Sequence, residues 1–273
     1  MWEKRDIMEF KEYICEVNNN RVVLVTDIHY VPTPYLSTAP DKRMDFLCED
    51  LQKEYENMPY DAILCLGDYS LDFWTGGTGG SYLNSPSVSN TQRFMDKVYS
   101  RFLQKAYVIA GNHEPYSEED WLSITGFPRK YSIVYGDYVF LMCDTFGGEL
   151  GPKEQSDGVY TGLDADFLKW ALKRYKSKKF ILCTHDLCPE QESEEVRSIV
   201  FENRNILFAF AGHTHKSNTV ILTEDWRNLP VFYCGDYSYF PYCKPDSIPE
   251  WGLRTLELGD NISTQYKKYP HKR

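Results

Sequence analysis

The 273-residue sequence predicts an α/β fold in which two packed mixed sheets lie between outer helices. The first observation is that apolar, strand-like runs alternate with amphipathic helical stretches early in the chain, which is typical of βαβ units. The second is that the pattern changes midway to a hairpin, and several strands joined by turns follow residue 216. Parallel units followed by antiparallel strands favour two mixed sheets with helices outside them.

The helices are predicted from apolar residues that recur at spacings of three and four. A short helical piece is expected from about Met8 to Val17, followed by helices over residues 42–57, about 90–104 and 164–175. The residues expected to face the core are Met44, Phe46, Leu47, Leu51 and Tyr55 in the first long helix, Phe94, Val98, Phe102 and Leu103 in the second, and Phe167, Leu168, Ala171 and Leu172 in the third.

Turn residues mark the ends of the later strands. Residues 131–135 and 138–143 indicate a hairpin closed at Gly136-Asp137, and further turns are expected at 228–230 and 259–261. The segment 73–90 has Gly-Gly-Thr-Gly-Gly at its centre and is expected to be a loop. It is either a flexible connection or a lid over a substrate, because long loops in compact domains tend to be functional.

Composition limits the classes of partner. The formal net charge of −10 argues against a surface built to bind bulk nucleic acid. The charged start of the chain and the lack of a run of about 18 apolar residues predict a cytoplasmic protein without a membrane span. We expect the whole chain, 1–273, to form one domain. Oligomeric state is left open.

The cysteines are expected to be reduced. The chain has eight, and four of them lie inside apolar runs, where a thiol behaves as a small buried hydrophobe: Cys65, Cys143, Cys183 and Cys234.

Five of the six histidines lie in short polar clusters that follow strand-like runs. The clusters are Asp27-Ile-His29, Gly67-Asp68, Gly111-Asn112-His113-Glu114, His185-Asp186 and Gly212-His213-Thr214-His215. One Asp or His at a strand end is more often a helix cap or an ordinary polar group, but five such ends in one chain indicate a metal site. In Asp-x-His and His-x-His, extended backbone would direct both side chains to one side of the chain.

The donor atoms in these clusters favour particular metals. Carboxylate, imidazole and amide donors suit Mn, Fe or Zn ions. Because a carboxylate has two oxygens, Asp68 is the candidate to bridge two ions.

These five motifs, in this order, resemble the calcineurin-like metallophosphoesterases over about residues 22–215. The resemblance implies a four-layer α/β/β/α sandwich, completed by the C-terminal strands, and two transition-metal ions, Mn or Fe with Zn as an alternative. It implies that one ion is held by Asp27, His29, Asp68 and His215, and the other by Asp68, Asn112, His185 and His213. It implies that His113 is catalytic, protonating the leaving oxygen while a metal-bridging hydroxide attacks phosphorus in line.

The sequence departs from the phosphoprotein phosphatases of this family after Gly67-Asp68. Those enzymes continue with x-x-Asp-Arg, whereas here Asp72 comes one residue late and Phe73 follows it. The Arg that binds phosphate is therefore missing, and the carboxylate that orients His113 is not identified. Arg93, Arg129 and Lys216 are cations that could act from elsewhere.

We therefore expect a phosphodiesterase acting on a small-molecule phosphoester, with Tyr30, Trp74 and Tyr82 as candidate aromatic contacts to the substrate or simply as packing residues. The alternatives are a phosphomonoesterase acting on small metabolites or phosphoproteins, and a non-catalytic scaffold with the same fold. The complete set of expected ligands favours catalysis.

Overall fold

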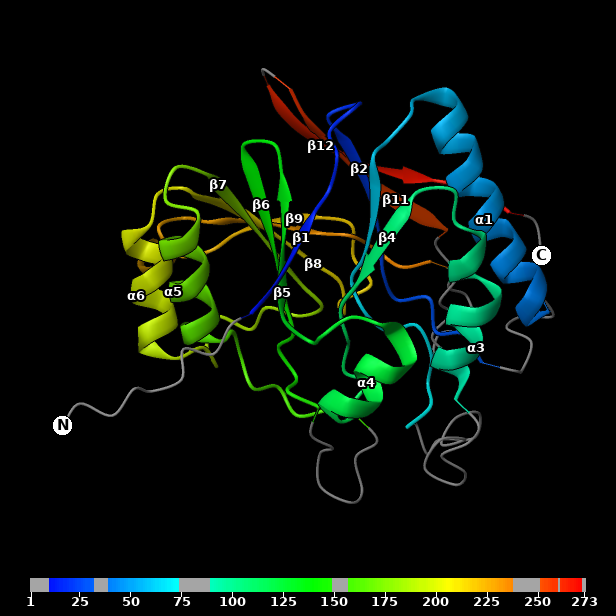
Figure 1. Ribbon diagram of the computed structural model, residues 1–273, viewed down its shortest axis with the longest axis horizontal. Coiled ribbons are helices and arrows are strands. Elements are labelled where there is room, and N and C mark those ends of the chain that lie inside the picture. Colours follow the sequence, from blue (N-terminus) through cyan, green and yellow to red (C-terminus); the bar gives the residue numbers. More distant parts are fainter. Residues whose placement is uncertain are drawn as a thin grey trace.

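The computed structural model describes residues 10–31, 39–73, 89–148, 157–237, 251–259 and 261–271, and two mixed sheets form its centre (Figure 1). The seven-stranded sheet has the order β1 (Lys11–Ile14), β5 (Tyr131–Tyr135), β6 (Tyr138–Cys143), β7 (Lys179–Thr184), β8 (Ile206–Ala211), β10 (Pro230–Tyr233) and β9 (Thr219–Ile221). The five-stranded sheet has the order β12 (Ile262–Lys268), β11 (Gly252–Leu258), β2 (Arg21–Val25), β3 (Ala62–Cys65) and β4 (Lys105–Val108).

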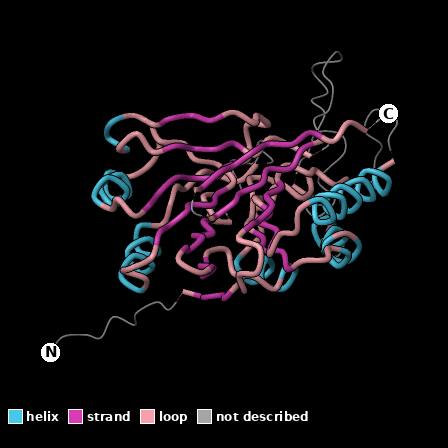
Figure 2. Tube along the Cα trace, turned by 90° about the horizontal axis from the view of Figure 1, so that it is seen from above, coloured by secondary structure: helices cyan, strands magenta, loops and turns pink. Residues whose placement is uncertain are grey.

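Helices cover the outer faces of both sheets. Helices α5 (Ala165–Arg174) and α6 (Glu194–Glu202) lie outside the seven-stranded sheet, and α1 (Pro40–Asn57) and α3 (Asn90–Lys97) lie outside the five-stranded sheet (Figures 1 and 2). Helix α4 (Glu118–Thr125) and the 3-10 turns η1 (Tyr99–Arg101) and η2 (Glu224–Trp226) complete the described helices. The predicted fold class, two mixed sheets flanked by helices, is confirmed.

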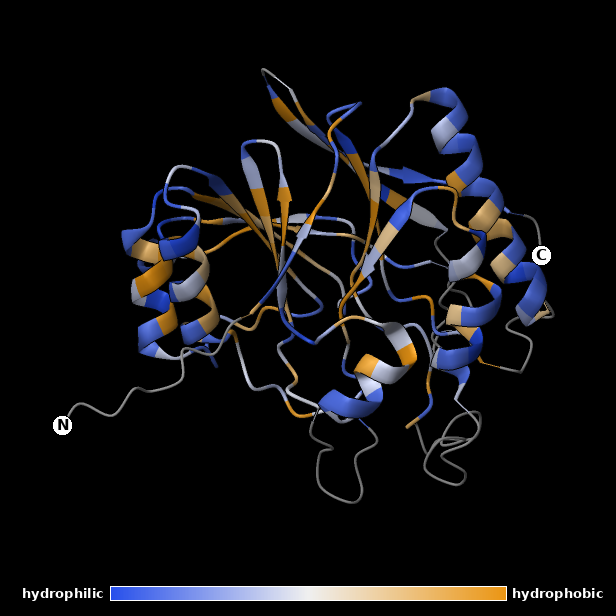
Figure 3. Ribbon diagram, in the orientation of Figure 1, coloured by the Kyte–Doolittle hydropathy of each residue, from blue (hydrophilic) through white to orange (hydrophobic). Residues whose placement is uncertain are grey.

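Side chains that alternate between the two faces of a strand contribute to two hydrophobic cores. In β6, Phe140 and Met142 belong to the main core, which contains residues of both sheets, whereas Val139 and Leu141 pack with Phe167 of α5. Successive side chains of a strand point to opposite faces, so β6 serves both cores. Figure 3 shows the resulting apolar strands between helices that carry both hydrophilic and hydrophobic residues.

Most predicted elements are confirmed. The 131–143 hairpin is present as β5 and β6, the 42–57 and 164–175 helices correspond to α1 and α5, and strands flank both expected late turns. The 90–104 helix is shorter than predicted, because regular helix ends at Lys97 and η1 follows, and the prediction that Leu103 faces the core is wrong, since its side chain is exposed. The segment 73–90 lies almost wholly outside the described residues. The assignment of residues 1–273 to one domain stays a prediction.

The predicted helical piece from Met8 to Val17 is wrong within the described residues, since Lys11–Ile14 form β1, parallel to β5. Tyr13 explains the difference, because its ring packs edge-on against Tyr107 and Tyr131 at 6.0 and 5.2 Å between centroids. Packing across the sheets therefore overrides a weak local helical pattern.

The strands that carry the polar clusters are parallel neighbours. Strands β2, β3 and β4 run parallel in one sheet, and β7 and β8 run parallel in the other. The carboxyl ends of parallel neighbours meet at one edge of a sheet, so the polar residues that follow these strands are brought together.

Candidate metal centre

The backbone is left-handed at five of the seven predicted ligands. Asp27, His29, Asp68, His213 and His215 all have φ between 49° and 62°, and they are five of the eight described non-glycine residues with positive φ. Such conformations cost energy for residues other than glycine and concentrate at functional sites. The expectation of extended backbone in Asp-x-His and His-x-His is therefore wrong.

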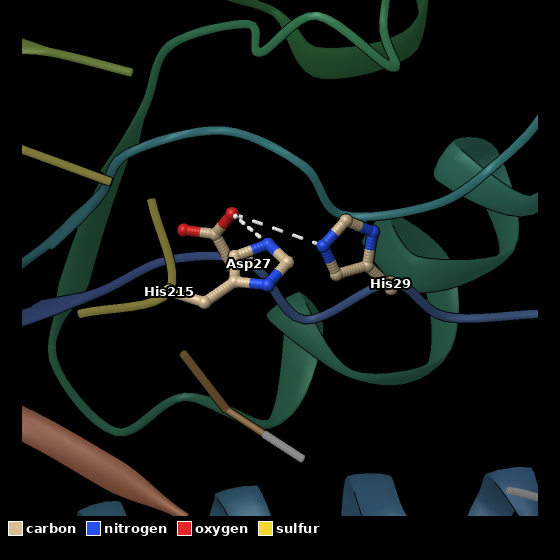
Figure 4. Close-up of side chains that lie close together, drawn as sticks. All are labelled: Asp27, His29 and His215. Carbon is tan, nitrogen blue, oxygen red and sulfur yellow. Dashed lines mark ion pairs between the residues drawn. The ribbon is translucent and has the colours of Figure 1, made fainter. Parts of the chain in front are cut away.

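One oxygen of the Asp27 carboxylate faces two imidazoles (Figure 4). Its Oδ1 is 3.1 Å from Nε2 of His215 and 3.7 Å from Nε2 of His29. Its Oδ2 accepts hydrogen bonds from Thr26 Oγ1 at 2.7 Å and from the His213 backbone N–H at 3.0 Å. One carboxylate oxygen is therefore held by donors, and the other faces two nitrogen donors suited to a cation.

Asp68 joins this group to a second one. Its Oδ2 lies 3.1 Å from Nε2 of His185 and 3.8 Å from Nε2 of both His29 and His113. Its Oδ1 accepts the backbone N–H of His113 at 3.1 Å. A single buried oxygen thus faces imidazoles from the segments that follow β2, β4 and β7.

The second group contains an amide oxygen. Oδ1 of Asn112 is 3.0 Å from Nε2 of His185 and 2.9 Å from Nδ1 of His213. Nδ1 of His185 donates to the Leu66 carbonyl at 2.6 Å, which leaves Nε2 to face Asp68. His213 and His215 belong to different groups, so they do not face one common centre, although both groups lie at the same strand ends.

His113 faces the centre with one nitrogen and a carboxylate with the other. Its Nδ1 is 3.0 Å from Oδ1 of Asp157, while Nε2 is directed toward Asp68. His113 is therefore not directed away from the centre, and the donor atoms of His29, Asp68 and His113 lie close enough together to hold a metal ion.

Glu114 is a functional residue that sequence reasoning missed. Its fully buried carboxylate accepts four backbone N–H bonds, from Asp68, Tyr69, Ser70 and Gly111, at 2.8 to 3.1 Å. These bonds tie the loop after β3 to the loop after β4. Its place directly after His113 in the Gly-Asn-His-Glu motif was the available signal.

Close packing also requires glycine at two positions. A Cβ at Gly67, whose φ is +90°, would lie 2.7 Å from the Gly111 nitrogen, and a Cβ at Gly111 would lie 2.1 Å from Asp68 Oδ1.

The electrostatic interactions within the cluster favour the binding of cations. Burial opposes ionisation of Asp27 and Asp68, but His185 and the other imidazoles hold the pKa of both carboxyls below its usual range. Burial lowers the pKa of His29 to about 4, so its ring is neutral at pH 7, which is the form that binds metals. Burial opposes the charged form of His185, yet Asp68 and Asp27 raise its pKa to about 10, and a cation would displace that proton.

Two further pKa shifts concern the loop after β4. Burial raises the pKa of Glu114 to about 7, with a further contribution from the Asp68 carboxylate. Burial opposes charge on His113, but the carboxylates of Asp68 and Asp157 outweigh it and raise the pKa of the imidazole.

Of the three predicted aromatic contacts, Tyr30 is the one that lies within the described residues. Tyr30 is 4% exposed and packs in the core, with its hydroxyl 3.3 Å from Asp41 Oδ1. Trp74 and Tyr82 lie outside the described residues. Arg129 is also buried, and its Nε donates to Asp144 at 2.5 Å.

These observations define a two-sheet α/β protein with clustered His and Asp side chains that could hold metal ions at the ends of parallel strands. The sequence profile of the calcineurin-like phosphoesterases matches residues 20–217, and the chain belongs to that family. Membership implies metal-dependent phosphoester hydrolysis and divalent metal binding in general terms. No curated protein matches the chain. Among the described helices, none combines the length and apolar character needed to cross a membrane.

Proposed function

We propose that this protein is a binuclear metal-dependent phosphoester hydrolase with a preference for phosphodiesters. The observation that carries the proposal is the position of Asp68 Oδ2, which faces His29 of one donor group and His185 of the other. A carboxylate shared by two donor groups is the arrangement that a pair of metal ions requires.

The donor set fits two cations. One would be held by Asp27, His29, Asp68 and His215, and the other by Asp68, Asn112, His185 and His213. Asp27 Oδ1 supports this fit, because it is fully buried, has no well-aligned hydrogen-bond donor among the described residues, and faces two imidazole nitrogens. Nitrogen and oxygen donors suit Mn, Fe or Zn.

The reaction follows from these positions. A bound pair of cations would lower the pKa of a water molecule toward neutrality and would offset the charge of the phosphoryl oxygens. The water oxygen bonds to phosphorus and releases one proton to solvent, and the bond from phosphorus to the leaving oxygen breaks. His113 in its protonated form gives the Nε2 proton to that leaving oxygen, and it regains a proton from solvent.

His113→Ala is expected to retain both metal ions and to lower kcat by about 10²- to 10⁴-fold for esters with a poor leaving group. The loss should be much smaller for nitrophenyl esters, because nitrophenolate leaves without a proton. Metal content and steady-state kinetics on both kinds of ester check this. Release of a metal ion from the variant would show that His113 is a ligand.

The preference for diesters is supported by two places in the described residues where no cation is offered to the phosphate. Asp72-Phe73 stands where the phosphatase branch has Arg, and Asp72 accepts the backbone N–H groups of Asn90 and Thr91 at the start of α3. The Arg129 guanidinium donates hydrogen bonds to Asp144 and to the carbonyls of Glu114 and Tyr116. A diester carries one negative charge fewer than a monoester dianion and so depends less on such an Arg.

Paired assays with bis- and mono-nitrophenyl phosphate under saturating Mn²⁺ test this preference. We expect the higher kcat/KM for the diester. A monoester preference of about tenfold or more would establish the phosphatase alternative. Turnover of neither ester with Mn²⁺, Fe²⁺ or Zn²⁺ would count against hydrolysis and favour the scaffold alternative.

A further inference from the structure

We propose that Asp157 is the positioning residue for His113, holding the imidazole with Nε2 directed at the reacting atoms. Oδ1 of Asp157 lies 3.0 Å from Nδ1 of His113, on the side of the ring opposite Asp68. The inference rests on the proposed function, because it assigns a role within the same reaction.

The carboxylate of Asp72, in the loop after β3, is hydrogen-bonded to other groups. Asp72 is fully buried, and it accepts the backbone N–H groups of Asn90 at 2.8 Å and Thr91 at 3.0 Å and the Ser89 hydroxyl at 3.0 Å. Tyr116 also donates its hydroxyl to Asp72. Asp72 therefore stabilises the start of α3. The Asp that comes one residue later than in the phosphoprotein phosphatases thus has a structural role.

Asp157 reaches His113 from a different part of the chain. It lies between β6 and α5, and the backbone N–H of the next residue, Gly158, donates to the Asn112 carbonyl at 2.7 Å. This bond docks the segment directly against the loop that carries His113. The Asp157 side chain is 44% exposed, and that of His113 is 10% exposed, so the carboxylate contacts the imidazole at the rim of the buried cluster.

The contact has two consequences for the ring. A carboxylate next to Nδ1 keeps a proton on that nitrogen, which fixes both the tautomer and the orientation of the imidazole. It also leaves an anion beside His113 when cations offset the charge of Asp68. Asp157 thus acts through His113 and does not itself contact the ester.

The test compares Asp157→Ala and Asp157→Glu with Asp166→Asn, an exposed position on α5 that removes the same charge. For esters with poor leaving groups, Asp157→Ala should lower kcat about 10- to 100-fold with KM and metal content unchanged. Asp157→Glu should restore part of the rate, and Asp166→Asn should match the wild type. Nitrophenyl esters should be affected least. In a His113→Ala background, Asp157→Ala should cause no further loss.

Nitrogen NMR of ¹⁵N-histidine-labelled, Zn²⁺-loaded protein tests the contact without turnover. We expect Asp157→Ala to shift the His113 Nδ1 resonance and leave that of His271 unchanged. Wild-type protein that hydrolyses no ester would remove the proposed function, and the NMR result would then decide the contact alone. Equal losses for all leaving groups, additive losses in the double variant, loss of metal, or an unshifted Nδ1 resonance would each overturn the assignment of Asp157.

Discussion

Replacement of Asp68 by Asn is expected to weaken the binding of both metal ions together and to abolish most of the hydrolytic activity. The amide can keep the Oδ1 contact to the His113 backbone N–H, and Asn tolerates the left-handed backbone with φ of 56°, so the loop should keep its shape. The change removes the charge of the oxygen that faces His29 and His185. The loss of activity should exceed the roughly 10- to 100-fold typical of residues that only support a ligand.

Metal titration by calorimetry, with elemental analysis of the dialysed protein, measures this effect. Asp137→Asn, at the exposed turn between β5 and β6, removes one charge far from these contacts and serves as the control. If Asp68→Asn loses one ion and binds the other with unchanged affinity, Asp68 is not shared, and the binuclear arrangement is wrong.

The location of the candidate centre could be predicted because it depends on strand ends. Apolar runs identify β2, β3, β4, β7 and β8, and parallel pairing brings the residues after them to one place. The motif order alone then predicts the family, which the match over residues 20–217 confirms. Helix α1 was equally predictable, because Met44, Leu47 and Leu51 form the buried stripe expected from their spacing.

The details of the centre could not be predicted in the same way, because they depend on loop backbone and on distant segments. The left-handed φ of His213 and His215 directs these two neighbours into different donor groups. Asp157 meets His113 across 44 positions of the chain, with no spacing to indicate it. The motif that contains Glu114 does not indicate its four hydrogen-bond partners, because these are backbone N–H groups that any residue type carries.

Short elements were missed for a related reason. Helices α4 and α6 are eight and nine residues long, so they offer little periodicity, although Ser117 and Ser193 cap their first turns. The four residues of β1 are defined by pairing with β5. Elements of this length take their structure from neighbours that only the folded chain provides.

Replacement of Glu54 by Ala is expected to lower the free energy of unfolding by about 3 to 5 kcal/mol. Glu54 lies on α1 with its side chain 2% exposed, and its carboxylate pairs with Arg21 of β2, whose side chain is also 2% exposed. Lys267 of β12 donates to it at 2.7 Å, and the Tyr269 hydroxyl donates as well. The variant would leave the Arg21 guanidinium buried without its main partner and would remove the contacts of Lys267 and Tyr269 with Glu54 on α1.

The effect of Glu54→Ala should depend on pH. Burial raises the pKa of Glu54, but the donors Lys267, Tyr269 and Arg21 outweigh it and hold the pKa below its usual 4.5. As pH falls, the Glu54 carboxylate is therefore protonated in the unfolded chain before it is protonated in the folded protein. The contribution of Glu54 to the free energy of unfolding is complete above about pH 4.5 and is lost as pH falls through the lower folded-state pKa. Urea unfolding should show that the difference in free energy of unfolding between Glu54→Ala and the wild type is smaller at acidic than at neutral pH. Glu49→Ala, exposed on the same helix, should change stability by less than about 0.5 kcal/mol. A Glu54→Ala loss below about 1 kcal/mol at pH 7, or one independent of pH, would mean that the carboxylate network does not stabilise the fold.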